Sequence, residues 1–303
     1  MVDAGGNGFS AMAAAGHPAE TGSSSEGWIA LTFPLTKRLV PAGMGRTKDD
    51  DYMKALILLF AWVLALCNVV AAGEEARFFE LRTYYAAPGK LDDLLARFRE
   101  HTTALFEKHG MVNIGYWTPL TNSDNKLTYL LAFPSREARA MAWKEFGADP
   151  AWQAVVKESE RNGKLVTKVE SVFLEATAFS PVVKPGHMDS PRVFELRTYH
   201  ATPGKLDALL ARFRDHTTGL FARHGMSQFG YFTPTEKKDG AGETLIYILA
   251  HTSLQSCEAS WKAFRADPDW VKAKADSEVD GPLTITNGVK SVLMAPTEFS
   301  PAK

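Results

Sequence analysis

The stretch Phe-Glu-Leu-Arg-Thr-Tyr occurs twice in this chain, at residues 79–84 and again at residues 194–199. Residues 79–119, which begin with this stretch, align without a gap to residues 194–234, and 30 of the 41 positions are identical. Internal similarity of this length is the sequence signature of a duplicated structural unit. The chain therefore contains two copies of one domain.

The similarity continues more weakly to the end of each copy. Both copies keep Ala-Asp-Pro-x-Trp, at 148–152 and 266–270, and both finish with Phe-Ser-Pro, at 179–181 and 299–301. Residues 182–191 hold two prolines, a glycine and few hydrophobic residues, which is typical of a linker. We therefore expect a first domain at 77–181, a linker at 182–191 and a second domain at 192–301.

The pattern of apolar residues in the first copy predicts its secondary structure. Residues 78–85 alternate as a strand does, whereas apolar residues recur at helical spacing from 91 to 105, before a glycine at 110. Strands are expected at 112–118, 127–133 and 166–174, and helices at 135–146 and from 150. This βαββαβ order is that of the ferredoxin-like unit.

A unit of this kind carries helices on one sheet face and leaves the other face to be covered. Two copies on one chain can cover each other. The predicted fold class is therefore α+β, with two tandem ferredoxin-like domains that pair as an intramolecular dimeric α/β barrel.

Three motifs resemble the NIPSNAP family over nearly all of both copies. They are Glu-Leu-Arg-x-Tyr, then Pro-Gly-Lys-Leu, then His-Gly before a Gly-Tyr-Trp/Phe-Thr strand. The resemblance implies a dimeric α/β-barrel fold shared with small monooxygenases, haem-degrading enzymes and stress-response barrels. It implies no single reaction, because family members lack a common one and some are described as binding or trafficking proteins.

The N-terminal quarter has a different character from the two copies. Residues 1–52 are rich in Gly, Ala and Ser without sustained periodicity, and we expect them to be unfolded or untranslated, with translation starting at Met53. Residues 53–72 combine a basic start, a short apolar run and small residues near Ala72, which is the pattern of a secretory signal. A membrane anchor is disfavoured because the run is short, and a lipoprotein signal because Leu66 is bulky. We expect a secreted or periplasmic protein without a stable membrane span.

Composition and motifs exclude several classes of function. The formal net charge is -1 and basic residues alternate with acidic ones, so no nucleic-acid partner is expected. The chain has no nucleophile elbow, phosphate loop, zinc-protease helix or dinucleotide fingerprint. Of its two cysteines, Cys67 falls in the signal and Cys257 on a predicted helix, so no metal site and no evident cofactor is predicted.

The first strand of each copy supplies the first candidate binding residues. Arg82 and Tyr84 share a strand face with Glu80, and the second copy repeats this set. If the apolar residues of the strand meet the helices, the polar set points into the barrel. Two interpretations stay open: a structural Glu–Arg ion pair, or an anion or carboxylate site. The ligand-binding candidates on this strand are Arg82, Tyr84, Arg197 and Tyr199.

Histidines of the first helix are the catalytic candidates. His101 and His109 lie eight residues apart, as do His216 and His224, which is about 12 Å along a helix and too far for one metal ion. Partly buried structural histidines are one interpretation. A general base or a haem ligand is the other, since histidine titrates near neutral pH.

An aromatic set completes the candidates. Tyr116 and Tyr129, with Tyr231 and Tyr247 in the second copy, are either core residues or ligand contacts. His251 replaces Phe133 of the first copy, so if only one half is active we expect it to be the second.

Three functions are compatible with these patterns. The leading hypothesis is an exported protein that binds a small molecule in an α/β-barrel cavity. The alternatives are a cofactor-independent monooxygenase or haem-degrading oxidoreductase, and a structural or protein-interaction module. The sequence leaves open the ligand and any oligomer beyond the internal pseudo-dimer.

Overall fold

The computed structural model describes residues 78–186 and 192–303, which lie within one compact unit of the chain. The predicted signal segment 53–72 and Cys67 lie outside the described residues. The elements of the first copy are β1 (Phe78–Ala86), α2 (Leu91–Arg97), η1 (Phe98–Thr102), α3 (Thr103–Lys108), β2 (Val112–Pro119), β3 (Lys126–Phe133), α4 (Arg136–Ala148), α5 (Pro150–Ser159) and β4 (Val166–Ala176). Those of the second are β5 (Val193–Ala201), α6 (Leu206–Arg212), η2 (Phe213–Thr217), α7 (Thr218–Arg223), β6 (Ser227–Pro234), η3 (Lys237–Asp239), β7 (Thr244–His251), α8 (Leu254–Ala266), α9 (Pro268–Ser277) and β8 (Thr284–Pro296).

Local sequence explains where these elements begin and end. The Ser135 side chain accepts a hydrogen bond from the Ala138 amide and caps α4. Asp149 caps α5, which starts with proline at its first position. Gly110 has a φ of +74°, the left-handed conformation that ends a helix. The first helix has one irregularity, because η1 is a five-residue π-helical turn between α2 and α3, and η2 repeats it in the second copy.

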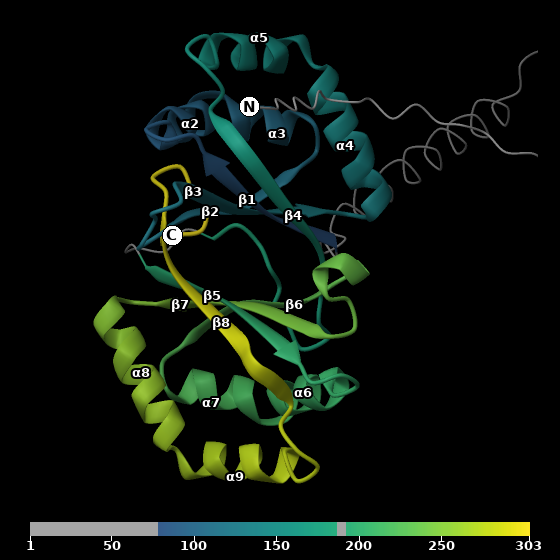
Figure 1. The fold of residues 1–303 in the computed structure, drawn as a ribbon, viewed down its shortest axis with the longest axis vertical. Helices are drawn as coiled ribbons and strands as arrows, with labels where there is room; N and C mark the ends of the chain where they lie inside the picture. Colours follow the sequence, from purple (N-terminus) through teal and green to yellow (C-terminus); the bar gives the residue numbers. More distant parts are fainter. Residues whose placement is uncertain (1–77, 187–191) are drawn as a thin grey trace, which may run out of the picture. The chain divides into compact units, whose positions relative to one another are not determined.

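The eight strands form a closed barrel in the order β1-β3-β2-β8-β5-β7-β6-β4. All pairings are antiparallel, and two of them join the copies: Trp117 of β2 pairs with Pro296 of β8, and Leu174 of β4 with Pro234 of β6. The two sheets face each other, with α2–α5 on the outer side of one and α6–α9 on the outer side of the other (Figure 1). The predicted intramolecular α/β barrel is confirmed.

Apolar side chains from both copies fill the barrel interior. The largest are Phe79, Trp117, Phe194 and Phe232, each no more than 1% exposed. Phe79 and Phe232 pack edge to face across the two copies, with ring centroids 5.1 Å apart. A separate apolar cluster lies between each sheet and its own helices. The structure therefore has three cores, of which the central one is shared.

The orientation of the first strand is opposite to the one considered from the sequence. Phe79 and Leu81 belong to the barrel interior, whereas Glu80 contacts Arg139 and Trp143 of α4. The polar set consequently faces the helices and does not line the barrel. The physical reason is that the apolar set is needed to cover the opposite sheet, where no helix is present.

Gly115 allows the central core to close. A Cβ atom at this position would lie 2.3 Å from Cζ2 of the Trp117 ring, far inside van der Waals contact. The strand is also irregular here, because the register of β2 against β3 shifts between Asn113 and Gly115. Only glycine lets the indole lie flat against its own strand.

Each copy ends by packing onto the other. The Ser180 hydroxyl accepts a hydrogen bond of 3.0 Å from the Tyr231 amide of the second copy. The Ser300 hydroxyl accepts one of 2.9 Å from the Tyr116 amide of the first. The phenylalanine ring of each Phe-Ser-Pro motif packs at a tilt against the same tyrosine, with ring centroids 5.4 Å apart in both cases. The repeated motif is therefore a reciprocal clasp between the copies.

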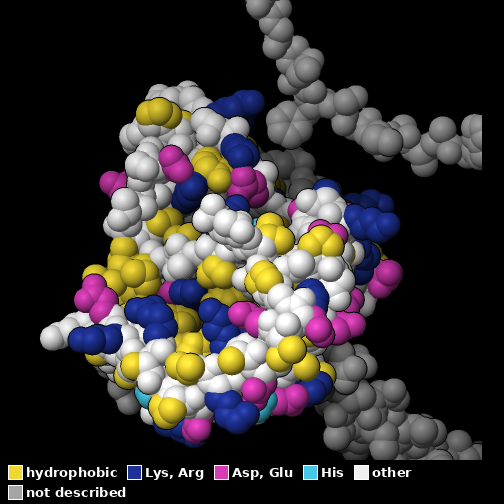
Figure 2. Space-filling view, turned by 60° about the horizontal axis from the view of Figure 1, so that its bottom comes forward, with side chains coloured by type: hydrophobic (Ala, Val, Ile, Leu, Met, Phe, Trp, Pro, Cys, Tyr) yellow, Lys and Arg dark blue, Asp and Glu magenta, His cyan; other side chains and the backbone are white. Residues whose placement is uncertain are grey.

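Charged side chains of both signs occur on the face drawn in Figure 2. Lys and Arg side chains are intermixed with Asp and Glu side chains over the face drawn in Figure 2. This agrees with the near-zero net charge of the chain.

Candidate functional site

A buried carboxylate lies between the sheet and α4 of the first copy. Glu80 is fully buried, and its oxygens accept hydrogen bonds from Arg82 (2.5 Å), Arg139 (2.7 and 2.8 Å) and the Trp143 indole (2.7 Å). The Ser171 hydroxyl of β4 adds another at 2.5 Å. The Arg82 guanidinium also lies 4.3 Å from the Trp143 ring centroid. Every lone pair of the carboxylate is accounted for, as buried charges require.

The second copy repeats this arrangement with different partners. Glu195 accepts from Arg197 (2.5 Å), Ser291 (2.6 Å) and the Trp261 indole (2.7 Å). His251 replaces Phe133, and its Nε2 lies 3.1 Å from Glu195 Oε2. Cys257 stands at the α8 position equivalent to Arg139, with Sγ 3.8 Å from the same oxygen. The sequence singled out His251 but missed Cys257, whose role depends on the geometry of α8.

These contacts determine the protonation states of the two carboxyls. Burial raises the pKa of Glu80, but hydrogen bonds and charge from Arg139 and Arg82 outweigh it, so the net pKa is lowered. In the second copy burial is outweighed by His251, Arg197 and Ser291, and the pKa of Glu195 falls to about 2. Burial beside Glu195 raises the pKa of the Cys257 thiol to about 12. The carboxylates are therefore ionised and the thiol is protonated at neutral pH.

The predicted tyrosine contacts divide into two groups. Tyr116, Tyr129, Tyr231 and Tyr247 are completely buried between sheet and helices, where Tyr116 stacks on Tyr129 with ring centroids 5.3 Å apart. Burial raises the pKa of all four phenols. These four are core residues. Tyr84 and Tyr199 are half-buried beside Arg82 and Arg197, at hydroxyl–guanidinium distances of 3.4 and 3.2 Å.

The four helix histidines also divide into two groups. His109 Nε2 lies 2.8 Å from Asp149 Oδ2, and His224 Nε2 lies 2.7 Å from Asp267 Oδ2. Both aspartates cap the following helix, so this pair of histidines links two helices. His101 and His216 are exposed on the π-helical turns. The structure therefore does not bring the four histidines together into one site.

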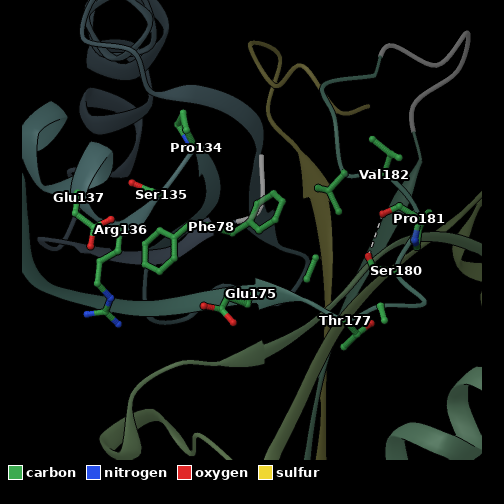
Figure 3. A pocket seen from close by; sticks show the side chains of 14 residues that line it. Phe78, Pro134, Ser135, Arg136, Glu137, Glu175, Thr177, Ser180, Pro181 and Val182 are labelled. Atoms are coloured by element: carbon green, nitrogen blue, oxygen red, sulfur yellow. Dashed lines mark hydrogen bonds between the residues drawn. The ribbon is translucent and has the colours of Figure 1, made fainter. Parts of the chain in front are cut away.

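A pocket of about 720 Å³ lies where β1 begins and β4 ends, and we call it the linker pocket. Phe78 and Phe79 line it together with Arg136, which begins α4, and Glu175 (Figure 3). The linker residue Val182 closes its far side. The Arg136 guanidinium lies 5.5 Å from the Phe78 ring centroid. The sequence does not indicate this pocket, because its lining comes from three segments that are far apart along the chain.

A charged contact between the copies orients Arg136. Its Nη1 pairs with Glu236 Oε1 at 2.7 Å, and its Nη2 donates to Thr235 Oγ1 at 2.9 Å. Arg136 remains 45% exposed, so its other donors are accessible. The equivalent residue of the second copy is Leu254, so the two copies differ here and only the first carries this cation.

Comparison with known proteins identifies the family of this chain. The NIPSNAP family model matches residues 79–181 and again residues 194–301. The chain belongs to the NIPSNAP family. Its relatives include NipSnap homolog 3B of Mus musculus, 26% identical over 246 residues that cover 78% of this chain and 92% of the relative. The NipSnap homolog of Dictyostelium discoideum is 25% identical over 211 residues, covering 68% and 84%.

Solved structures are similar to this chain as well. An uncharacterized NIPSNAP domain protein from Burkholderia xenovorans is 27% identical, covers 34% of this chain and 98% of its own, and has a TM-score of 0.31. An anthrone oxidase-like protein is 11% identical and has a TM-score of 0.50, covering 75% of this chain and 94% of its own. At 11% identity, the similarity to the anthrone oxidase-like protein shows only that the two proteins share a fold. Among the described residues of this NIPSNAP protein, no helix has the length and apolar character that a membrane crossing needs.

Proposed function

We propose that this NIPSNAP protein binds a small organic molecule that combines an apolar body with an anionic group. The observation that carries the proposal is the linker pocket, whose volume of about 720 Å³ matches that of small-molecule sites. Phe78 lines the pocket with an aromatic ring, the exposed linker residue Val182 adds apolar surface, and Arg136 offers a planar cation for a carboxylate or sulfonate. The filled interior of the barrel leaves this end of the barrel as the site that we propose for the ligand.

A fluorescent probe with the same chemistry tests the proposal. We expect 1-anilinonaphthalene-8-sulfonate to bind at one site, and Arg136→Leu, which installs the residue of the second copy, to weaken binding at least about tenfold. The matched control is Glu236→Gln, which breaks the ion pair but keeps the cation, and it should bind at least as well as the parent. Equal binding by Arg136→Leu and the parent protein would refute the site.

A native mass spectrum of protein purified without added ligand tests the same proposal for the natural molecule. Extra mass that disappears on denaturation would identify what the pocket holds. A bare mass, together with no probe binding, would instead favour the structural or protein-interaction module. The filled interior of the barrel is the observation that supports this second candidate.

An oxidoreductase activity is the third candidate, and it rests on His101 and His216. Both line surface hollows: His101 with charged neighbours such as Glu100 and Glu158, and His216 with Asp215 and Asp269. Charged, open surroundings favour polar ligands over a large apolar macrocycle such as haem. A haemin titration decides this point, since a Soret shift lost in His101→Ala or His216→Ala would support the haem hypothesis and a flat titration would remove it.

Export belongs to the proposal as well. It is supported by the basic start, apolar run and small residues of positions 53–72. Expression of the chain with its own leader, followed by N-terminal sequencing of the mature product, should give Gly73 as the first residue. A product that retains residues 53–72 in the cytoplasm would contradict export.

A further inference from the structure

The two copies differ most sharply around their buried carboxylates. Glu80 and Glu195 share three kinds of partner, which are an arginine two residues later, a serine of the last strand and a tryptophan indole. The remaining contacts differ. Arg139 donates two hydrogen bonds to Glu80, whereas His251 and Cys257 approach Glu195.

The substitution changes the charge of the cluster. In the first copy one carboxylate is balanced by two guanidinium groups, which leaves a net charge of one positive unit. In the second copy Arg197 alone balances Glu195, and a sulfur and a nitrogen take the place of the second cation. These two atoms are ligands for transition metals.

The geometry fits a single ion. Glu195, His251 and Cys257 each offer a ligand atom, and the three atoms lie within 4.8 Å of one another. Among the described residues, this is the one group of three potential metal ligands that lie this close together. The Oε2–Nε2 distance is 3.1 Å and the Oε2–Sγ distance is 3.8 Å. Metal–ligand bonds of about 2.0–2.3 Å at tetrahedral angles separate ligand atoms by about 3.3–3.8 Å.

The surroundings also fit an ion. His251 is 1% exposed, Glu195 3% and Cys257 4%, so the ligands are shielded from water. Ser291 and Arg197 bond Oε1, and the Trp261 indole bonds Oε2, which fixes the carboxylate as outer-shell partners of a metal ligand do.

We propose that Glu195 Oε2, His251 Nε2 and Cys257 Sγ bind one Zn²⁺-like divalent transition metal ion, in the second copy alone. On binding, Cys257 releases its thiol proton to solvent and the imidazole coordinates in its neutral form. The ion and thiolate together add one positive unit to the cluster, which is what Arg139 adds in the first copy. Three protein ligands leave the fourth tetrahedral position to a non-protein ligand.

Cobalt titration of the full chain, kept reduced with a phosphine, tests the site. We expect one Co²⁺ per chain, with a thiolate-to-cobalt charge-transfer band and visible ligand-field bands typical of four-coordination, all abolished by added Zn²⁺. Cys257→Ser should remove the charge-transfer band, and His251→Phe, the residue of the first copy, should weaken binding at least about 100-fold.

Two further variants separate coordination from folding. Ser291→Ala removes only an outer hydrogen bond and should weaken binding about tenfold. His200→Gln replaces a histidine of β5 whose ring contacts Thr244 and lies outside the cluster, and it should leave the spectrum unchanged. Circular dichroism confirms that each variant is folded. A titration without the thiolate band, or one unaffected by His251→Phe, would overturn the site.

Discussion

Glu80 organises the helix-facing side of the first sheet. It is fully buried, and two arginines, an indole and a hydroxyl converge on it. The substitution Glu80→Gln leaves Arg82 and Arg139 without their counter-charge. We expect the free energy of unfolding to fall by about 3 kcal/mol, as for other broken buried ion pairs. Urea unfolding measures this, and the exposed Glu175→Gln serves as control. A change no larger than that of the control would contradict the assigned role.

Asp149 gives a pH-dependent contribution to stability. Hydrogen bonds from Lys108 and His109 lower the pKa of its carboxyl below the ordinary value. A group with a lowered folded-state pKa stabilises the fold above its unfolded pKa of about 3.9, and the stabilisation is lost as the pH falls further. Asp149→Asn keeps a good helix cap but removes the charge. Its melting temperature should lie below that of the parent at pH 6, and the difference should shrink as the pH falls toward 3.

The contrary result would be a deficit in melting temperature that stays constant from pH 6 to pH 3. That outcome would mean that the cap geometry, and not the charge on Asp149, stabilises the junction of α4 and α5. Asp267→Asn repeats the test in the second copy, because the pKa of Asp267 is lowered by His224 in the same way.

The candidate site shows which residue roles a sequence reveals. Arg82 and Tyr84 were selected because they share a strand face, and the structure does place them side by side. The sequence predicts that Cys257 lies on a helix, but nothing in it indicates that α8 turns the thiol toward Glu195. Arg136 was not selected, because its pocket is formed by segments that meet only in the folded chain.

At the scale of elements, the reciprocal clasp makes a prediction. The Ser300 hydroxyl is buried and accepts from the Tyr116 amide of the other copy. Ser300→Ala leaves that buried amide without its partner and should lower the free energy of unfolding by about 1–3 kcal/mol. Chemical unfolding measures it. Ser123→Ala, in an exposed turn, should have no effect, and an equally small effect of Ser300→Ala would mean that the clasp is not stabilising.

The order of helices and strands was predictable from local patterns. Which face of each sheet points into the barrel was not. Alternation in the first strand separates Phe79 and Leu81 from Glu80 and Arg82, yet both sets are largely buried in the structure. A strand covered by helices on one side and by another sheet on the other has no solvent face to mark its orientation. The π-helical turns were unpredictable for a related reason, because one inserted residue barely disturbs helical periodicity.

For the whole molecule, the shared central core predicts that the two copies unfold together. Phe79 and Trp117 of the first copy pack against residues of the second, so separated copies would expose a large apolar face. Phe264→Ala weakens only the core between sheet and helices of the second copy, by about 3–5 kcal/mol. Calorimetry should nevertheless show one transition, displaced to lower temperature, with equal calorimetric and van't Hoff enthalpies. Phe146→Ala, the equivalent change in the first copy, should displace it by a similar amount. If instead half of the heat absorption stayed at the parent temperature, the copies would be independent domains and the barrel only a contact between them.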